Sequence, residues 1–146
     1  MFENVLVGGI FGGGRAERPA SAPALAALDL TGLAGRANTR AGTLTLLERK
    51  RLELARALAT APRVLLLDEI AGGLGEQEVQ ELVEVIRRVH REGVAIVWIE
   101  HIVHALRSVV SRLAVISAGR LLTEGAPDDV MRSPEVQRVY LGIDVQ

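Results

Sequence analysis

Two acidic side chains follow directly on a short apolar run. Residues 64–67 are all apolar, and Asp68 and Glu69 come next. A run that is apolar on both faces is typical of a buried parallel strand, so this one is expected to present two carboxylates at its carboxyl end. In phosphate chemistry Asp68 would hold Mg²⁺ through water, and Glu69 would polarise an attacking water molecule. The alternative is a strand that simply ends in solvent at two acids.

A histidine follows the next apolar run. Residues 95–99 predict a second buried strand, and Glu100 and His101 come after it. An imidazole at a strand end can hydrogen-bond a terminal phosphate and sense it. The alternative is an ordinary surface histidine. His90 and His104 lack this placement, and we expect both to face solvent.

A helix with a capped N-terminus precedes the first strand. Thr45 and Glu48, three residues apart, predict a capping box, and the helix would run to Leu58 before Pro62 ends it. The free amides at such a helix start favour an anion. The alternative is an amphipathic helix whose cap has only a structural role.

A glycine-rich stretch lies nearer the start of the chain. Residues 9–16 have the outline of a phosphate loop, G-x-x-x-x-G-K-[ST], but Arg15 replaces the lysine and Ala16 replaces the hydroxyl that would bind Mg²⁺. The sequence then continues into Pro19 and not into a clear helix. We therefore expect a flexible, weakly packed linker, with a short helix only over 24–30.

The remaining elements predict an α/β fold with a mainly parallel central sheet, because strands and helices alternate from residue 64 onward. We expect two parts, namely a loop-rich and helical subdomain over 1–62 and the C-terminal half of a core over 63–146. Helices are expected over 76–91, 102–109, 127–131 and 134–141, and two strands over 113–116 and 120–122 around the turn 117–119.

Composition excludes several classes of function. The 146 residues include 17 basic and 18 acidic side chains, and this balance argues against a nucleic-acid partner. There is no cysteine, so disulfides and thiolate metal sites are excluded. The sequence has no run of about 18 apolar residues and no signal peptide pattern, so we expect any membrane link to go through a partner.

Taken in order, these motifs resemble the second part of an ABC-type ATPase, a P-loop NTPase. Residues 44–58 resemble the signature segment and its helix, and 65–69 resemble Walker B with the catalytic glutamate. Residues 72–74 lie where the D-loop is found, and 99–101 resemble the switch-histidine segment. Four motifs in the family's order and spacing carry this resemblance.

The tail is similar to one subfamily, the ATP-binding subunits of branched-chain amino acid ABC transporters. Residues 133–136 and 140–142 carry this similarity, and 119–120 and 124–127 resemble the family's preceding turn and G-x-P segment. Residues 3–7 resemble the segment just after the Q-loop. The fold implied is therefore a partial P-loop NTPase core with an ABC-type helical segment, without the N-terminal Walker A lobe.

The resemblance implies roles for ATP and Mg²⁺ as cofactors. Asp68 would position the metal, Glu69 would orient the hydrolytic water, and His101 would contact the γ-phosphate. A second ABC ATPase subunit would hold the ATP that this chain caps with the start of its signature helix, at Thr45, Leu46, Leu47 and Glu48.

Two features depart from the family. Leu46 and Leu47 stand where an aromatic residue or glycine and then glycine are usual, and the bulk of Leu47 is expected to weaken contact with phosphate. The second departure is the missing Walker A segment. Walker A supplies the amides and lysine that hold phosphate, so we expect this chain alone not to hydrolyse ATP. We also expect an exposed sheet edge and marginal stability.

These observations favour a truncated ATP-hydrolysing component of an ABC transporter for branched-chain amino acids or similar solutes. It would bind transmembrane permease subunits at the cytoplasmic face of the membrane. The alternative is a non-catalytic module that docks on a permease through residues 31–59 or dimerises with a full-length ATPase subunit. ABC-type ATPases of DNA repair are a third class, but the sequence has no heptad run for their coiled coils.

Overall fold

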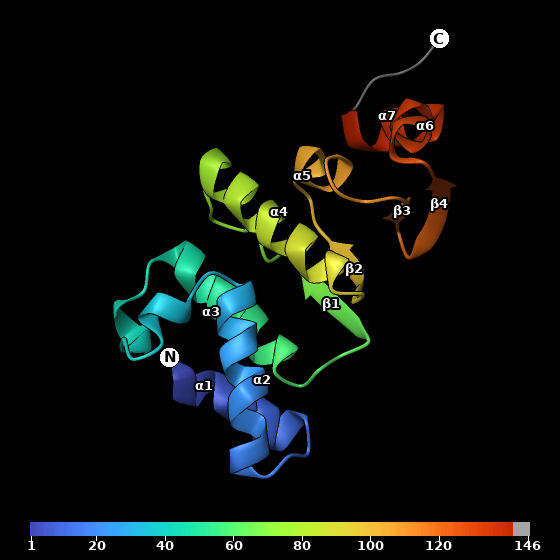
Figure 1. Cartoon of the computed structure of the whole chain (residues 1–146). Coiled ribbons are helices and arrows are strands. Elements are labelled where there is room, and N and C mark those ends of the chain that lie inside the picture. Colours follow the sequence, from blue (N-terminus) through green and yellow to red (C-terminus); the bar gives the residue numbers. More distant parts are fainter. Residues whose placement is uncertain (142–146) are drawn as a thin grey trace. The chain divides into compact units, whose positions relative to one another are not determined.

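The computed structural model describes residues 1–141, which form two compact units. Unit 1 comprises Met1–His101, and unit 2 begins at Ile102 (Figure 1). The predicted division at residue 62 falls inside unit 1 and stays a prediction, and the last residues of the predicted part 63–146 lie outside the described residues.

Unit 1 begins with helices where the sequence predicted a linker. Helix α1 (Phe2–Val7) continues directly into a π-helical segment, Gly8–Gly12, and α2 follows over Glu17–Leu30. Two short 3₁₀ turns, Ala34–Arg36 and Ala41–Thr43, lead to α3 (Leu46–Leu58). The prediction of a flexible linker over the glycines is therefore wrong.

Close packing explains why glycines occupy these helical positions. A Cβ atom on Gly8 would lie 2.5 Å from the carbonyl oxygen of Arg56 in α3, and one on Gly9 would lie 3.3 Å from the Cβ of Ala20 in α2. The glycines let three helices approach one another, and α2 contributes the fully buried Ala24 and Leu28. The expectation of weak packing is also wrong. Several of the buried residues here are glycine or alanine, and such small side chains give little hydrophobic periodicity in the sequence even when they pack closely.

The predicted start of α3 is confirmed. The hydroxyl of Thr45 accepts a hydrogen bond from the backbone N–H of Glu48 at 3.3 Å, and the backbone N–H of Thr45 donates to the Glu48 carboxylate at 2.9 Å. This reciprocal capping box satisfies two amides that the first helical turn cannot.

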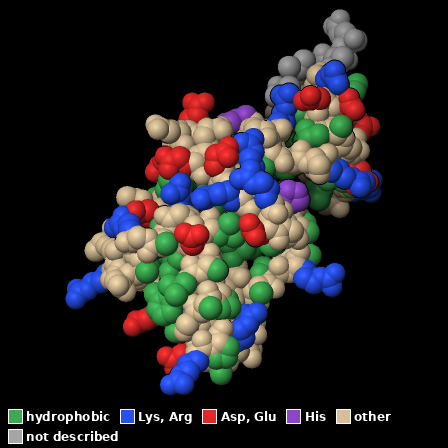
Figure 2. Space-filling view, viewed as in Figure 1, with side chains coloured by type: hydrophobic (Ala, Val, Ile, Leu, Met, Phe, Trp, Pro, Cys, Tyr) green, Lys and Arg blue, Asp and Glu red, His purple; other side chains and the backbone are tan. Residues whose placement is uncertain are grey.

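The sheet of unit 1 has two parallel strands, β1 (Val64–Asp68) and β2 (Ala95–Ile99). Helix α4 (Glu76–Arg91) makes the crossover between them, and Gly93 ends the crossover with a positive φ of 85°. Figure 2 shows acidic and basic side chains over α4, whose opposite face is buried. These elements confirm the predicted α/β arrangement and its parallel pairing. The buried side chains of α4 are Val79, Leu82, Val83, Val85, Ile86 and Val89.

One face of this sheet is open. Leu65 and Leu67 are buried, but the alternate side chains of both strands are exposed, so the prediction of strands buried on both faces is wrong for the described residues. Helices pack on one face only, whereas a parallel sheet is normally covered on both. The open face, as we call it, consists of Val64 (52% exposed), Leu66 (74%), Val97 (54%) and Ile99 (62%).

Unit 2 contains the predicted hairpin. After the short helix α5 (Val103–Arg107), strands β3 (Leu113–Ser117) and β4 (Arg120–Gly125) pair antiparallel. The two turn residues, Ala118 and Gly119, both have positive φ, as a tight hairpin turn requires. Helices α6 (Pro127–Arg132) and α7 (Pro134–Leu141) follow, and both were predicted. Within residues 1–141, no helix combines the length and apolarity needed to cross a bilayer.

We predict that Gly8→Ala destabilises the chain by about 1–3 kcal/mol, because the new methyl group must displace the backbone of Arg56. Urea denaturation measures this change in the free energy of unfolding. Gly42→Ala is the matched control, since a Cβ there meets nothing within 4 Å, and its effect should stay within about 0.5 kcal/mol. Equal effects of the two substitutions would show that the close approach of the helices is not what requires Gly8.

Candidate functional site

The parallel pairing brings two loops together at the carboxyl edge of the sheet. Asp68 and Ile99 are partners in the register, and the backbone N–H of Glu69 donates to the carbonyl of Ile99 at 2.9 Å. The residues that follow β1 therefore lie beside those that follow β2. Asp68, Glu69 and His101 are all exposed at this edge.

Glu69 and His101 face each other. The Nδ1 atom of His101 lies 3.5 Å from a carboxylate oxygen of Glu69, and both side chains remain more than 60% exposed. Glu69 has a positive φ of 44°, a conformation that costs energy for a residue with a side chain. Strained backbone of this kind occurs often at functional sites, so the turn after β1 is a candidate reactive centre.

Glu100 is a component of this site that the sequence did not single out. Its side chain has no exposed surface, and its two oxygens accept hydrogen bonds from the backbone N–H groups of Ala71 at 3.0 Å and His101 at 3.2 Å. The same carboxylate lies 3.5 Å from Nδ1 of His101. The only signal in the sequence is an acidic residue between an apolar strand and a histidine.

The start of α3 forms a second part of the candidate site. Leu46 is 43% exposed, and its side chain lies 3.2 Å from the position that a Cβ on Gly73 would take, so this helix end reaches the loop after β1. Leu47 is buried, so its side chain lies in the core, and its expected effect on contact with phosphate stays a prediction. Thr45 is engaged as the cap.

The carboxylate of Glu48 is held by its surroundings. The backbone N–H of Thr45 donates to it and lowers the pKa of Glu48, and the neighbouring guanidinium of Arg36 lowers this pKa further. The carboxylate adds negative charge at the helix start, where the resemblance implies that phosphate would approach. Its ion pair with Arg36 offsets that charge.

The glycine-rich stretch does not form a phosphate loop. Such a loop connects a strand to a helix, whereas here helix α1 precedes the segment. Arg15, at the position of the expected lysine, donates a hydrogen bond to the carbonyl of Ala59 at 3.0 Å. The structure thus agrees with the sequence argument against a phosphate loop.

The exposed acidic side chains at this edge suit Mg²⁺ only when a nucleotide supplies further oxygen ligands. Residues 1–141 contain no group of three His, Cys, Asp or Glu side chains arranged to hold a metal. Mg²⁺ is commonly bound by one or two carboxylates, several waters and the phosphates of the substrate. An exposed carboxylate such as Asp68 suits that role, with the phosphates completing the coordination.

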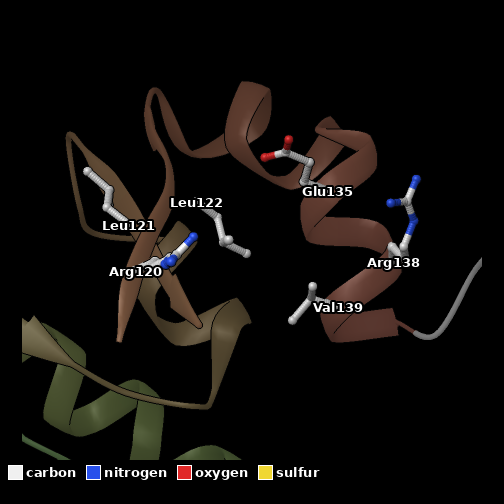
Figure 3. Close-up of a pocket in the computed structure, with 6 residues that line it drawn as sticks. All are labelled: Arg120, Leu121, Leu122, Glu135, Arg138 and Val139. Atoms are coloured by element: carbon white, nitrogen blue, oxygen red, sulfur yellow. The ribbon is translucent and has the colours of Figure 1, made fainter. Parts of the chain in front are cut away.

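Unit 2 has a cavity of about 410 Å³ between β4 and α7 (Figure 3). Figure 3 shows Leu122 and Val139 pointing into this space, with Arg138 directed away from it. None of its side chains is buried, so the cavity offers no desolvated polar group to fix a ligand. The lining residues are Arg120, Leu121, Leu122, Glu135, Arg138 and Val139.

Comparison with known sequences gives consistent matches. A family model described as a branched-chain amino acid ATP-binding cassette transporter matches residues 120–145. The chain is 37% identical over 129 residues to the high-affinity branched-chain amino acid transport ATP-binding protein BraF of Pseudomonas aeruginosa, and 36% identical over 129 residues to LivG of Escherichia coli. Each match covers 88% of this chain and 51% of the relative.

Solved structures share the fold. An ATP-binding cassette of an ABC transporter in its ADP conformation superposes with a TM-score of 0.87 at 23% identity, covering 97% of this chain and 62% of the cassette. A cassette from Clostridium perfringens gives a TM-score of 0.76 at 25% identity, covering 88% of this chain and 53% of the cassette. The chain spans about half the length of the curated relatives it matches.

The described residues therefore have the fold of part of the ATP-binding cassette of ABC transporters, which is a P-loop NTPase fold. The resemblance to the ATP-binding subunits of branched-chain amino acid transporters, inferred from the motifs, is confirmed by the matches in sequence. Gly142, the end of the similar tail, lies outside the described residues.

We predict that the stability of the chain depends on the charge of Glu48. Because its pKa is lowered in the folded state, this contribution is fully present above the ordinary value of 4.5 and is lost as the pH falls through the folded-state pKa. Glu48→Gln should be less stable than the wild type by about 0.5–1 kcal/mol at pH 7, and the difference should shrink below pH 4.5.

Chemical denaturation at a series of pH values measures this dependence. Glu53→Gln is the control, because Glu53 is an exposed residue of the same helix. A difference between the wild type and Glu48→Gln that does not change with pH would contradict a charge-dependent cap.

Proposed function

We propose that this chain supplies the Walker B and switch-histidine part of the ATP-hydrolysing component of an ABC transporter for branched-chain amino acids or similar solutes. The observation that supports the proposal is the 3.5 Å approach of Glu69 and His101 beside Asp68 at one edge of a parallel sheet. The relatives named for branched-chain amino acid transport support the choice of solute.

Each side chain at this edge has a separate task in the proposal. ATP bound with Mg²⁺ supplies the phosphoryl group. Asp68 accepts hydrogen bonds from metal-bound water, and Glu69 orients the attacking water. His101 contacts the terminal phosphate through Nε2, the edge of its ring away from Glu69. Phosphoryl transfer depends mainly on positioning and charge stabilisation, and these residues provide both.

The start of α3 serves a second nucleotide in the proposal. Its free backbone amides would face the phosphates of ATP held by a second ATPase subunit. Arg36 offsets the charge of Glu48, so the acid of the capping box does not repel this nucleotide. Leu46 and Leu47 would contribute their backbone amides there, Thr45 caps the helix, and the side chain of Leu47 stays in the core.

The open face is where the remaining part of the cassette binds in this proposal. The 146 residues contain no segment of the form G-x-x-x-x-G-K-[ST], so a phosphate loop must come from another segment. The open face is apolar and the curated relatives are about twice as long, which supports a polypeptide that carries the loop and covers this face. Permease subunits would then hold the assembly at the cytoplasmic face of the membrane.

A second candidate function is a non-catalytic docking module. It is favoured by Phe11 (80% exposed) and Leu25 (52%), apolar side chains in the helical part of unit 1. Figure 2 shows apolar side chains at the surface over α1 and α2, next in sequence to the predicted docking segment 31–59. Co-purification with a permease in the absence of any ATPase activity would favour this candidate.

We predict that the chain alone does not bind Mg-ATP in a calorimetric titration, but that it hydrolyses ATP when mixed with the unmatched half of the Pseudomonas aeruginosa relative. Glu69→Gln should lower hydrolysis by the mixture about 100-fold or more while nucleotide binding persists, because it removes the group that orients water. Glu84→Gln, an exposed change on α4, should leave the rate unchanged. A mixture that binds nucleotide but shows no hydrolysis would contradict the catalytic proposal.

We predict that Leu66→Glu prevents this assembly. Leu66 is 74% exposed in the free chain, so the substitution costs little stability there but would bury a charge once the open face is covered. Sedimentation of the mixture should show a complex for the wild type and separate components for the variant. Leu25→Glu on α2 is the matched control and should still form the complex. Assembly of Leu66→Glu with unchanged affinity would show that the open face is not the binding surface.

A further inference from the structure

A carboxylate without access to solvent lies behind the exposed pair of Glu69 and His101. The side chain of Glu100 is 0% exposed, whereas those of Glu69 and His101 are 63% and 62% exposed. Burial of an ionised carboxylate is unfavourable unless hydrogen bonds and charges compensate it. Among residues 1–141, Glu100 has no Lys or Arg partner, so backbone amides and the imidazole supply that compensation.

The hydrogen bonds of Glu100 join the two loops of the site. One oxygen accepts from the N–H of Ala71 in the turn after β1, and the other accepts from the N–H of His101 after β2. Glu69 begins that turn with a positive φ, and Gly72 donates back to its carbonyl at 3.1 Å. A strained turn persists only when its surroundings hold it, and the bond from Ala71 to Glu100 is one such restraint.

Glu100 also restrains the ring of His101. Oxygen atoms of Glu69 and Glu100 both lie 3.5 Å from Nδ1, and an ionised carboxylate can only accept hydrogen bonds. A proton on Nδ1 would therefore point at two acceptors, whereas a lone pair there would face two acids. Glu69 is exposed, whereas two amides hold the buried Glu100 in place, so Glu100 is the fixed acceptor.

We propose that Glu100 is a positioning residue that holds the turn after β1 and sets the orientation and tautomer of the His101 ring. The role of that ring towards a phosphate rests on the proposed function, but the restraint itself does not. With Glu100 in place, Glu69 can turn towards water without releasing the imidazole.

The test is nuclear magnetic resonance of the protein with ¹⁵N-labelled histidine, without nucleotide. Glu100→Gln places an amide group where an acceptor is needed, so either Ala71 or His101 loses its hydrogen bond. We expect backbone N–H exchange of at least one of them to become about tenfold faster or more, and the fraction of the Nδ1–H tautomer of neutral His101 to fall.

Glu69→Gln is the matched control, because Glu69 lies equally close to Nδ1 but accepts no bond from Ala71. It should leave both exchange rates and most of the tautomer unchanged. The proposal is overturned if Glu100→Gln keeps the wild-type tautomer and both exchange rates. If Glu100→Gln does not fold, Glu100→Asp is the second variant. It keeps the charge, but its side chain is too short to reach both amides. Unchanged exchange of the Ala71 and His101 amides in Glu100→Asp would then overturn the proposal.

The two proposals fail in different ways. Loss of the tautomer and of amide protection in Glu100→Gln, together with no hydrolysis by the wild-type mixture, would reject the proposed function and keep the positioning role. Hydrolysis by the wild-type mixture, together with unchanged spectra of Glu100→Gln, would reject the positioning role and keep the function.

Discussion

The parallel pairing of β1 with β2 is the constraint on which the candidate site depends. Each strand alone ends in polar residues that could face solvent in any direction. The register that places Asp68 opposite Ile99, with the bond from Glu69 N–H to the Ile99 carbonyl, brings both strand ends to one edge. Helix α4 makes this pairing possible, because parallel strands need a long crossover, and its buried apolar face fixes where the crossover lies.

The edge of the sheet combines a buried carboxylate with an exposed one. Glu100 is fully buried and bonded to two amides, while Glu69 is exposed on a strained turn. The same residue type thus occurs in two different environments within one site. A fixed acceptor keeps the imidazole in one orientation, so the exposed acid is free to interact with water or a ligand. This division of tasks gives the site a defined geometry in a chain whose sheet is open on one face.

The helical half of unit 1 owes its packing to small residues. Gly8, Gly9, Ala20 and Ala24 allow α1, α2 and α3 to lie close together, so the glycines act as contact points and not as hinges. The sheet shows the opposite situation, since its large aliphatic side chains remain exposed on the open face. The chain spans about half the length of the curated relatives it matches, and the covering of the open face by a further polypeptide is part of the proposed function.

The sequence by itself determined the elements from residue 45 onward and the motif order. The capping box of Thr45 and Glu48, the helix over 76–91, the hairpin around Ala118 and Gly119 and the two strands were all predictable, because they depend on local periodicity, caps and turn residues. The positions of Asp68, Glu69 and His101 at strand ends followed from the same patterns. Only the tertiary structure decided that Gly8–Gly12 is helical, that Leu47 is buried, that one sheet face is open and that Glu100 joins two loops. These features depend on what lies opposite each residue in space, and contacts between distant segments leave no periodic signal in the sequence.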